Sequence, residues 1–320
     1  MTTPSALSPE QSPEQSRDGS PGPDAEQERA QEPVSGRDEA ADPALAESAQ
    51  EPAEPTGPTP AEPIVVERTE NELRTLLGLG PVRAVLPLGV RARGWIVTGV
   101  VGLIAALLRL IGLNHPRTLM FDEIYYVKDA YSLWHLGYEG SWAANSDAAF
   151  ANGNFSGLST EAAYVVHPQL GKWLIGAGME IFGPESPFGW RFMPAVAGIL
   201  TVMLLTRLTM RLTRSPLLAG LAGLLLAIDG VALTESRIGL LDVFIGFFAT
   251  LTLYCLVRDR EWSRARLARK MAGTAPGARA PRATIRPWLL AAAIALGLTC
   301  SIKWSGLYLV AVSGIAVVIW

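Results

Sequence analysis

Two adjacent acids, Asp122 and Glu123, are the first residues in this sequence whose types and spacing could carry out chemistry. They stand in the segment FDEIYY, with apolar and aromatic neighbours on both sides. A carboxylate in such surroundings is partly desolvated, which suits it to accept a proton from a hydroxyl as a general base. A pair of acids is equally typical of a solvated surface loop, so the residues around the pair decide between the two interpretations.

Three isolated cations stand at the edges of later apolar segments. Arg191 precedes one apolar run, Arg237 lies between two others, and Lys303 lies in the turn KWSG. The charge pattern described below places these edges outside a membrane, where isolated cations go against the positive-inside trend. Each of them then needs an anion, which a lipid headgroup or a bound phosphate could supply.

The segment IDGVALTESRIGLLD adds two acids beside Arg237, namely Glu235 and Asp242. Ionisable groups at or within membrane depth are costly, and by default they indicate a functional site. The structural alternative is an ion pair between Arg237 and one of these two acids.

His167 and Lys172 stand in the segment HPQLGK, which we expect to open a helix. His167 could equally be a cap or a packing residue, and Lys172 could extend its ammonium group from apolar surroundings to water. Together with the acids and cations above, they suggest a site that neutralises a leaving phosphate and activates an acceptor hydroxyl. Such a site fits an enzyme that uses an anionic lipid-linked donor.

The apolar runs that position these residues are long enough for membrane spans, which need about 20 apolar residues of helix. The sequence therefore predicts an all-α polytopic membrane protein with spans near residues 95–113, 192–208, 216–233, 238–257, 288–302 and 307–320. The last run reaches residue 320 with no polar segment after it, so we expect the chain to be part of a longer protein.

The basic residues orient these spans. Arginines gather before the first span, between the second and third, and between the fourth and fifth, so these connections and the N-terminus should be cytoplasmic. Residues 114–190 then form an outside loop. Within it, residues 124–136 and 167–182 are predicted to be helices lying at the outer interface. If residues 167–182 crossed the membrane instead, every later basic loop would lie outside.

The N-terminal part differs in composition from the rest. Residues 1–75 hold 17 Asp and Glu against 5 Lys and Arg, whereas residues 76–320 hold 13 against 22. The first part is rich in Pro, Glu, Ser and Ala, so we predict a disordered, acidic cytoplasmic tail over residues 1–75. It lacks the features of a signal peptide. No residues have metal-ligand spacing, so we expect no tightly bound metal and no cofactor, and no nucleic-acid partner is indicated.

Five segments occur in an order and spacing that match a known family: FDEIYYVKDA, HPQLGKWLI, WRFMPAVAG, AIDGVALTESRIGLLD and SIKWSGLY. Over residues 95–320 the chain resembles the actinobacterial-type protein O-mannosyltransferases, of the dolichyl- or polyprenyl-phosphate-mannose–protein mannosyltransferase family. The family fold is a GT-C-type bundle of about eleven spans. The resemblance implies that residues 76–320 are the N-terminal part of this transmembrane domain, truncated after about six spans.

The resemblance also implies the reaction and the roles of the residues. Mannose would pass from polyprenyl-phosphate mannose to Ser or Thr of a secreted protein, with inversion, at the outer face of the plasma membrane. Asp122 would be the general base and Glu123 would support the acceptor or the sugar. The lipid phosphate would be bound by Arg191, Arg237 and Lys303. The cavity would be lined by His167, Lys172, Glu235 and Asp242.

One position departs from the family pattern, and two other functions stay open. Gln169 stands where the family usually has a second proline after His167, which loosens the entry to this helix.

A related GT-C enzyme acting on a lipid or polysaccharide would share the early acid. A transporter or flippase would spread its charges through the membrane depth, whereas these charges gather at one boundary. The protein transferase would act on unfolded or translocating proteins, with the secretion machinery as a possible partner.

Overall fold

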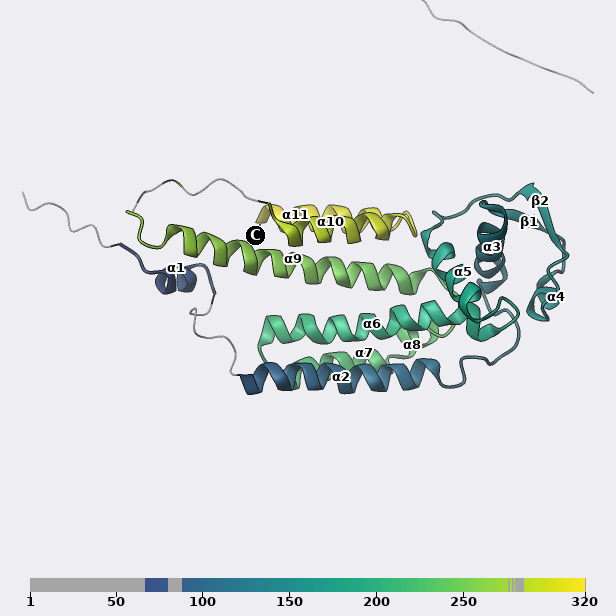
Figure 1. Ribbon diagram of the computed structural model, residues 1–320, viewed down its shortest axis with the longest axis horizontal. Coiled ribbons are helices and arrows are strands. Elements are labelled where there is room, and N and C mark those ends of the chain that lie inside the picture. The colour runs from purple at the N-terminus through teal and green to yellow at the C-terminus, as the bar shows by residue number, and fades with distance from the viewer. Residues whose placement is uncertain (1–66, 80–87, 276, 278, 280–284, 320) are drawn as a thin grey trace, which may run out of the picture. The chain divides into compact units, whose positions relative to one another are not determined.

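The computed structural model describes residues 67–79, 88–275, 277, 279 and 285–319. These residues are mostly helical. The helices that correspond to the predicted spans are α2 (Leu88–Leu110), α6 (Pro187–Thr213), α7 (Pro216–Ile228), α9 (Asp242–Met271), α10 (Pro287–Cys300) and α11 (Gly306–Ile319). Figure 1 shows them running side by side, with α2 and α7 packed on α6, and α6 and α10 packed on α9.

Small residues let these helices approach closely. Buried Val101 and Ala105 of α2 meet Val202 of α6 and Ala227 of α7 in one apolar cluster. In α7, Gly223 lies directly against the side chain of Thr206 in α6, where a Cβ atom would overlap the hydroxyl oxygen. A side chain at this position would therefore push α7 away from α6.

Two helical segments, Gly89–Leu110 and Pro187–Thr213, are long and apolar enough to cross a membrane. The other four predicted spans are also helical, but α7, α10 and α11 are shorter apolar helices and α9 continues into a charged half. Large apolar side chains such as Leu103 of α2 and Leu217 of α7 are exposed. Apolar faces of this kind are typical of a surface covered by lipid or by further protein.

The run predicted as one span over residues 216–233 is divided in two. Asp229 ends α7 and caps α8 (Gly230–Glu235), because its side chain accepts a hydrogen bond of 2.8 Å from the backbone N–H of Ala232. An N-cap residue has non-helical backbone angles, so a new helix begins there. The predicted span is therefore too long at its C-terminal end.

The segment between α2 and α6 folds into a small group of helices and strands at one end of these helices (Figure 1). It contains α3 (Glu123–Leu136), α4 (Asp147–Ala151), α5 (Leu170–Phe182) and an antiparallel pair of strands, β1 (Gly140–Trp142) and β2 (Leu158–Ala162). Buried Phe150 packs edge-on against Tyr131 and Trp142 at the centre.

Both helices predicted within the outside loop are present, as α3 and α5. The 13 residues of α5 correspond to about 20 Å of helix, which is shorter than the roughly 30 Å of a bilayer core. This length favours a helix that does not cross the membrane. The interfacial position of α3 and α5, and the side on which they lie, stay predictions.

The predicted disordered tail is too long at its C-terminal end. A short helix, α1 (Glu70–Leu76), begins within it and packs on α9. Thr69 and Glu72 form a capping box that satisfies two backbone N–H groups at its start. The rest of the prediction, over residues 1–66, lies outside the described residues.

Candidate functional site

Asp122 lies at the N-terminus of α3, in a hollow of about 490 Å³ that Tyr126, Asp129, Trp142 and Lys172 also line. It stands at the N-cap position but makes no side-chain capping bond, so its carboxylate is not used to hold the helix. The preceding residue has a left-handed backbone, with a φ of 52° at Phe121. Such a conformation is strained for a bulky residue, and strain of this kind clusters at functional sites.

Tyr126 follows Asp122 by one helical turn of α3, and both side chains line the hollow. Burial and the negative charges of Asp122 and Asp242 raise the pKa of Tyr126 to about 12, so its hydroxyl stays protonated. The Tyr126 ring lies 6.0 Å from the His167 ring, centroid to centroid. These contacts bring the acid from the start of α3 and the histidine before α5 into one group.

His167 responds to all the charges of this group. Burial, followed by the positive charges of Lys303 and Lys172, lowers its pKa, while Asp242 and Asp122 act in the opposite direction. The imidazole is therefore neutral near pH 7. Its Nδ1 atom is buried without a hydrogen-bond partner among the described residues.

Lys303 and Asp242 form an ion pair beside His167. The Lys303 ammonium lies 2.9 and 2.8 Å from the two Asp242 carboxylate oxygens. The side chains are 21% and 43% exposed, so a ligand could reach them. Nearby, burial raises the pKa of Glu235, as does the Asp242 charge, while Lys303 opposes both effects. Asp122, His167, Glu235, Asp242 and Lys303 thus lie close enough to influence one another electrostatically, and their roles in a site stay predictions.

Glu123 and Arg191 are bonded to each other instead of facing the hollow. Both side chains are fully buried, with Arg191 Nη2 2.7 Å and Nε 2.8 Å from the two Glu123 carboxylate oxygens. Arg191 also donates to the backbone oxygens of Leu113, Pro116 and Thr118. All five N–H groups of the guanidinium are therefore used within the protein.

This arrangement corrects two predicted roles. Glu123 also accepts hydrogen bonds from the backbone N–H groups of Met120 and Gly239, at 2.8 and 2.7 Å. Its carboxylate has no capacity left for an acceptor or a sugar, and Arg191 has no donor left for a lipid phosphate. The pair instead fixes the start of α3 against α6 and the turn before α9.

Lys172 has two acidic partners within the protein. Its buried ammonium group lies 2.9 Å from Asp129 and 2.7 Å from Glu139. Burial raises the pKa of both acids, and the Lys172 charge partly offsets this. Lys172 therefore lines the hollow, as predicted, while its charge is held by the two acids.

Arg237 is bound to the end of α2. It donates from Nη1 to the carbonyl groups of Leu108 and Arg109 in the last turn of that helix and of Ile111 just after it. Among the described side chains it forms no ion pair with Glu235 or Asp242, because Asp242 pairs with Lys303 instead. The structural alternative considered for this segment is therefore wrong, and Arg237 acts as a C-terminal cap.

Sequence reasoning missed Tyr126, Asp129 and Glu139 as members of the site. A signal for the first two was present, because Asp122, Tyr126 and Asp129 follow the spacing i, i+4, i+7 and so share one helix face. No such signal exists for Glu139, which reaches Lys172 from the loop after α3. The described residues contain no group of three or more His, Cys, Asp or Glu side chains placed to hold a metal ion.

Comparison with known proteins places this site in a family. Residues 158–320, about half of the chain, match the family described as dolichyl-phosphate-mannose-protein mannosyltransferase. The chain belongs to this family. The matched residues include His167, Glu235, Asp242 and Lys303, whereas Asp122 lies before them.

Curated relatives carry a similar description. Polyprenol-phosphate-mannose–protein mannosyltransferases are 38% identical over 238 residues in Mycolicibacterium smegmatis and 36% identical over 261 residues in Mycobacterium tuberculosis. The alignments cover 72% and 78% of this chain, but only 42% and 44% of the relatives. The protein of the same description from Corynebacterium glutamicum is 34% identical over 69% of this chain and 41% of its own length. The chain thus spans less than half the length of these relatives, and no solved structure matches it.

Proposed function

We propose that this chain supplies the N-terminal part of an enzyme that transfers mannose from polyprenyl-phosphate mannose to Ser or Thr hydroxyl groups of secreted proteins. The observation that carries the proposal is the group formed by Asp122, Tyr126, His167, Asp242 and Lys303. It combines an acid whose oxygens are not used for capping with a cation that a ligand can reach. The family membership of the chain supports both the donor and the protein acceptor.

In the proposed reaction Asp122 acts as the general base. The acceptor hydroxyl oxygen attacks C1 of mannose while its proton passes to the Asp122 carboxylate. The bond between C1 and the phosphate oxygen breaks, and the bonding electrons leave with the lipid phosphate. Attack opposite the leaving group inverts the configuration at C1. Tyr126 lines the hollow beside Asp122, and its hydroxyl remains a donor at neutral pH.

Lys303 is the residue best placed to stabilise the leaving phosphate. Its ammonium group has one more donor than its two bonds to Asp242 use. His167 adds a neutral imidazole whose Nδ1 atom has no partner within the described structure. Positive charge directed at developing negative charge is usually the largest single contribution to such a transfer. Arg237 is assigned no part in phosphate binding, because it bonds to backbone oxygens at the end of α2.

The location of the reaction is part of the proposal. We place the protein in the plasma membrane as a multi-pass protein, with a cytoplasmic N-terminus and the Asp122 hollow outside. The distribution of arginines and the apolar helices α2 and α6 support this orientation. The acceptors would then be unfolded or translocating proteins, met close to the secretion machinery.

The test is transfer by the purified full-length protein. Labelled polyprenyl-phosphate mannose is supplied with a Ser/Thr-rich peptide, with the same peptide carrying Ala at those positions, and with a lipid extract. We expect label on the first peptide alone, with inverted anomeric configuration by NMR. Label on lipid or polysaccharide, with none on the peptide, would instead identify a related glycosyltransferase and would refute the proposed acceptor.

A further inference from the structure

A second hollow lies at the other end of α6 from the Asp122 site. Arg191 stands near the start of α6, and Arg211 and Arg214 stand at its end. The 20 residues from Arg191 to Arg211 correspond to about 30 Å of helix, which equals the thickness of a bilayer core. If α6 crosses the membrane, the second hollow therefore lies at the level of the lipid headgroups on the opposite face.

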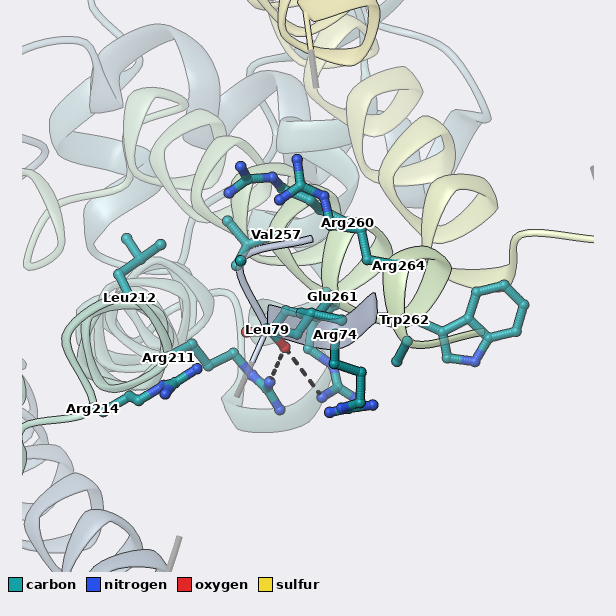
Figure 2. A pocket seen from close by; sticks show the side chains of 13 residues that line it. Arg74, Leu79, Arg211, Leu212, Arg214, Val257, Arg260, Glu261, Trp262 and Arg264 are labelled. Atoms are coloured by element: carbon teal, nitrogen blue, oxygen red, sulfur yellow. Dashed lines mark hydrogen bonds and ion pairs between the residues drawn. The ribbon is translucent and has the colours of Figure 1, made fainter. Parts of the chain in front are cut away.

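This hollow is strongly basic. It has a volume of about 680 Å³ and is formed by α1 with the turn after it, the end of α6, and the middle of α9. Glu261 is the one acid among the described residues that line it. The cations that line it are Arg74, Arg211, Arg214, Arg258, Arg260 and Arg264. Figure 2 shows Arg260 and Arg264 extending to one side of the segment that carries Leu79, and Arg74 and Arg211 to the other.

One arginine of the hollow joins α9 to the turn after α1, and another is paired within α1. Arg264 donates to the backbone oxygen of Leu77 at 2.9 Å, which fixes the turn after α1 to α9. Arg74 lies 3.8 Å from Glu70, one turn earlier in α1. The wall that α1 contributes is therefore anchored to the helix on the opposite side.

The acid that lines the hollow offsets only part of its positive charge. Glu261 is shared between Arg211, at 2.5 Å, and Arg258, at 4.0 Å. Arg214 makes no ion pair with any residue that the structure describes. Several like charges within one Debye length of about 8 Å repel one another unless an anion binds between them.

The surroundings identify the kind of anion. Apolar side chains accompany the arginines, with Leu212 of α6 63% exposed beside Arg211. Leu212 belongs to α6, which is long and apolar enough to span a membrane and ends at Thr213. An anion bound here would sit just beyond the hydrocarbon core, with apolar surface beneath it. Basic hollows in this position between helices are where anionic lipid headgroups bind.

We propose that this arginine hollow binds the phosphate of an anionic phospholipid headgroup. The arginines hold the phosphate oxygens, and Leu212 and the adjacent face of α6 lie along the acyl chains. With the orientation predicted from the sequence, the lipid belongs to the cytoplasmic leaflet. The site is separate from mannose transfer and stands whether or not the proposed function is correct.

The experiment measures binding of fluorescent phosphatidylglycerol to the full-length protein in micelles that also contain phosphatidylcholine. The variant Arg214→Gln/Arg260→Gln removes two charges that line the hollow. The control Arg269→Gln/Lys270→Gln removes two charges from the last turn of α9, outside the hollow. We expect the first variant to bind roughly thirtyfold more weakly than wild type. The control should bind as wild type does.

A charge-conserving variant tests whether the weaker binding comes from a folding defect. Arg214→Lys/Arg260→Lys keeps both charges and should retain most of the binding. An equal loss in the hollow variant and the control would indicate diffuse attraction to a charged surface and would overturn the proposal. Displacement of the lipid by inorganic phosphate or glycerol phosphate at equal concentration would show a site for free anions, and would overturn the assignment to lipid.

The acidic N-terminal segment is a rival occupant that the same assay tests. Residues 1–66 hold 14 acids against 3 bases and belong to the same chain. A variant in which these acids are replaced by amides is compared with wild type. If only this variant binds phosphatidylglycerol, then the segment itself fills the hollow in wild type, and the proposal is wrong. Binding that is unchanged by these replacements supports the lipid assignment.

Discussion

Replacing Glu123 by Gln tests whether this acid is part of the framework or of the chemistry. The substitution removes the negative charge opposite Arg191 and turns one carboxylate oxygen into a donor. Both side chains are fully buried, and Arg191 has no second acid among its described partners. An uncompensated buried charge costs about 3–5 kcal/mol. The pair of Lys128 with Asp147 is partly open to solvent, with side chains 14% and 44% exposed, and should contribute only about 1 kcal/mol.

The assay is thermal unfolding of the purified full-length protein, followed by tryptophan fluorescence. A loss of about 3–5 kcal/mol should lower Tm on the order of 10 °C. Asp147→Asn is the matched control, and its Tm should lie close to that of wild type. Mannose transfer by Glu123→Gln, measured well below its Tm, should keep the wild-type KM for the donor and the acceptor. An unchanged Tm with a raised KM for either substrate would refute the framework role and restore Glu123 to the site.

Three further predictions concern the lysines and the histidine. Lys303→Met should raise the donor KM and lower kcat by roughly 10²–10³-fold, because the leaving phosphate loses its cation; donor titration with labelled lipid-linked mannose measures both. Lys172→Met should lower Tm as Glu123→Gln does, since Asp129 and Glu139 would be left buried without their cation. His167 has a pKa below its ordinary value of 6.5, so the unfolded state binds more protons below that pH. The stability of the wild type should therefore fall as the pH decreases below 6.5. Tm measured against pH should fall less steeply in His167→Gln than in wild type.

The helices could be predicted from the sequence because their apolar runs are long and uninterrupted. Their ends could not, since these depend on single capping residues. Thr69 with Glu72 starts a helix inside a segment whose composition predicts disorder, and Asp229 divides one apolar run into two helices. A hydropathy pattern averages over such residues, so it places a helix correctly and misplaces its ends.

The members of the site were easier to predict than their partners. The sequence indicates that Asp122, His167, Asp242 and Lys303 gather at one boundary, and in the structure their charges influence one another. It does not indicate that Arg191 pairs with Glu123, because 68 residues separate them along the chain. A charged residue at the edge of a span has the same sequence signature whether it binds a ligand or stabilises the fold. Burial and hydrogen-bond partners distinguish the two, and both require the tertiary structure.

The most direct test of Asp122 as the general base is single-turnover mannose transfer by the full-length Asp122→Asn variant. Asparagine is similar in shape and cannot accept the proton, and α3 should be unaffected because Asp122 makes no side-chain capping bond. We predict a decrease in the transfer rate of roughly 10²–10⁴-fold, with donor binding unchanged and Asp147→Asn as active as wild type. Transfer by Asp122→Asn at the wild-type rate would contradict the assignment.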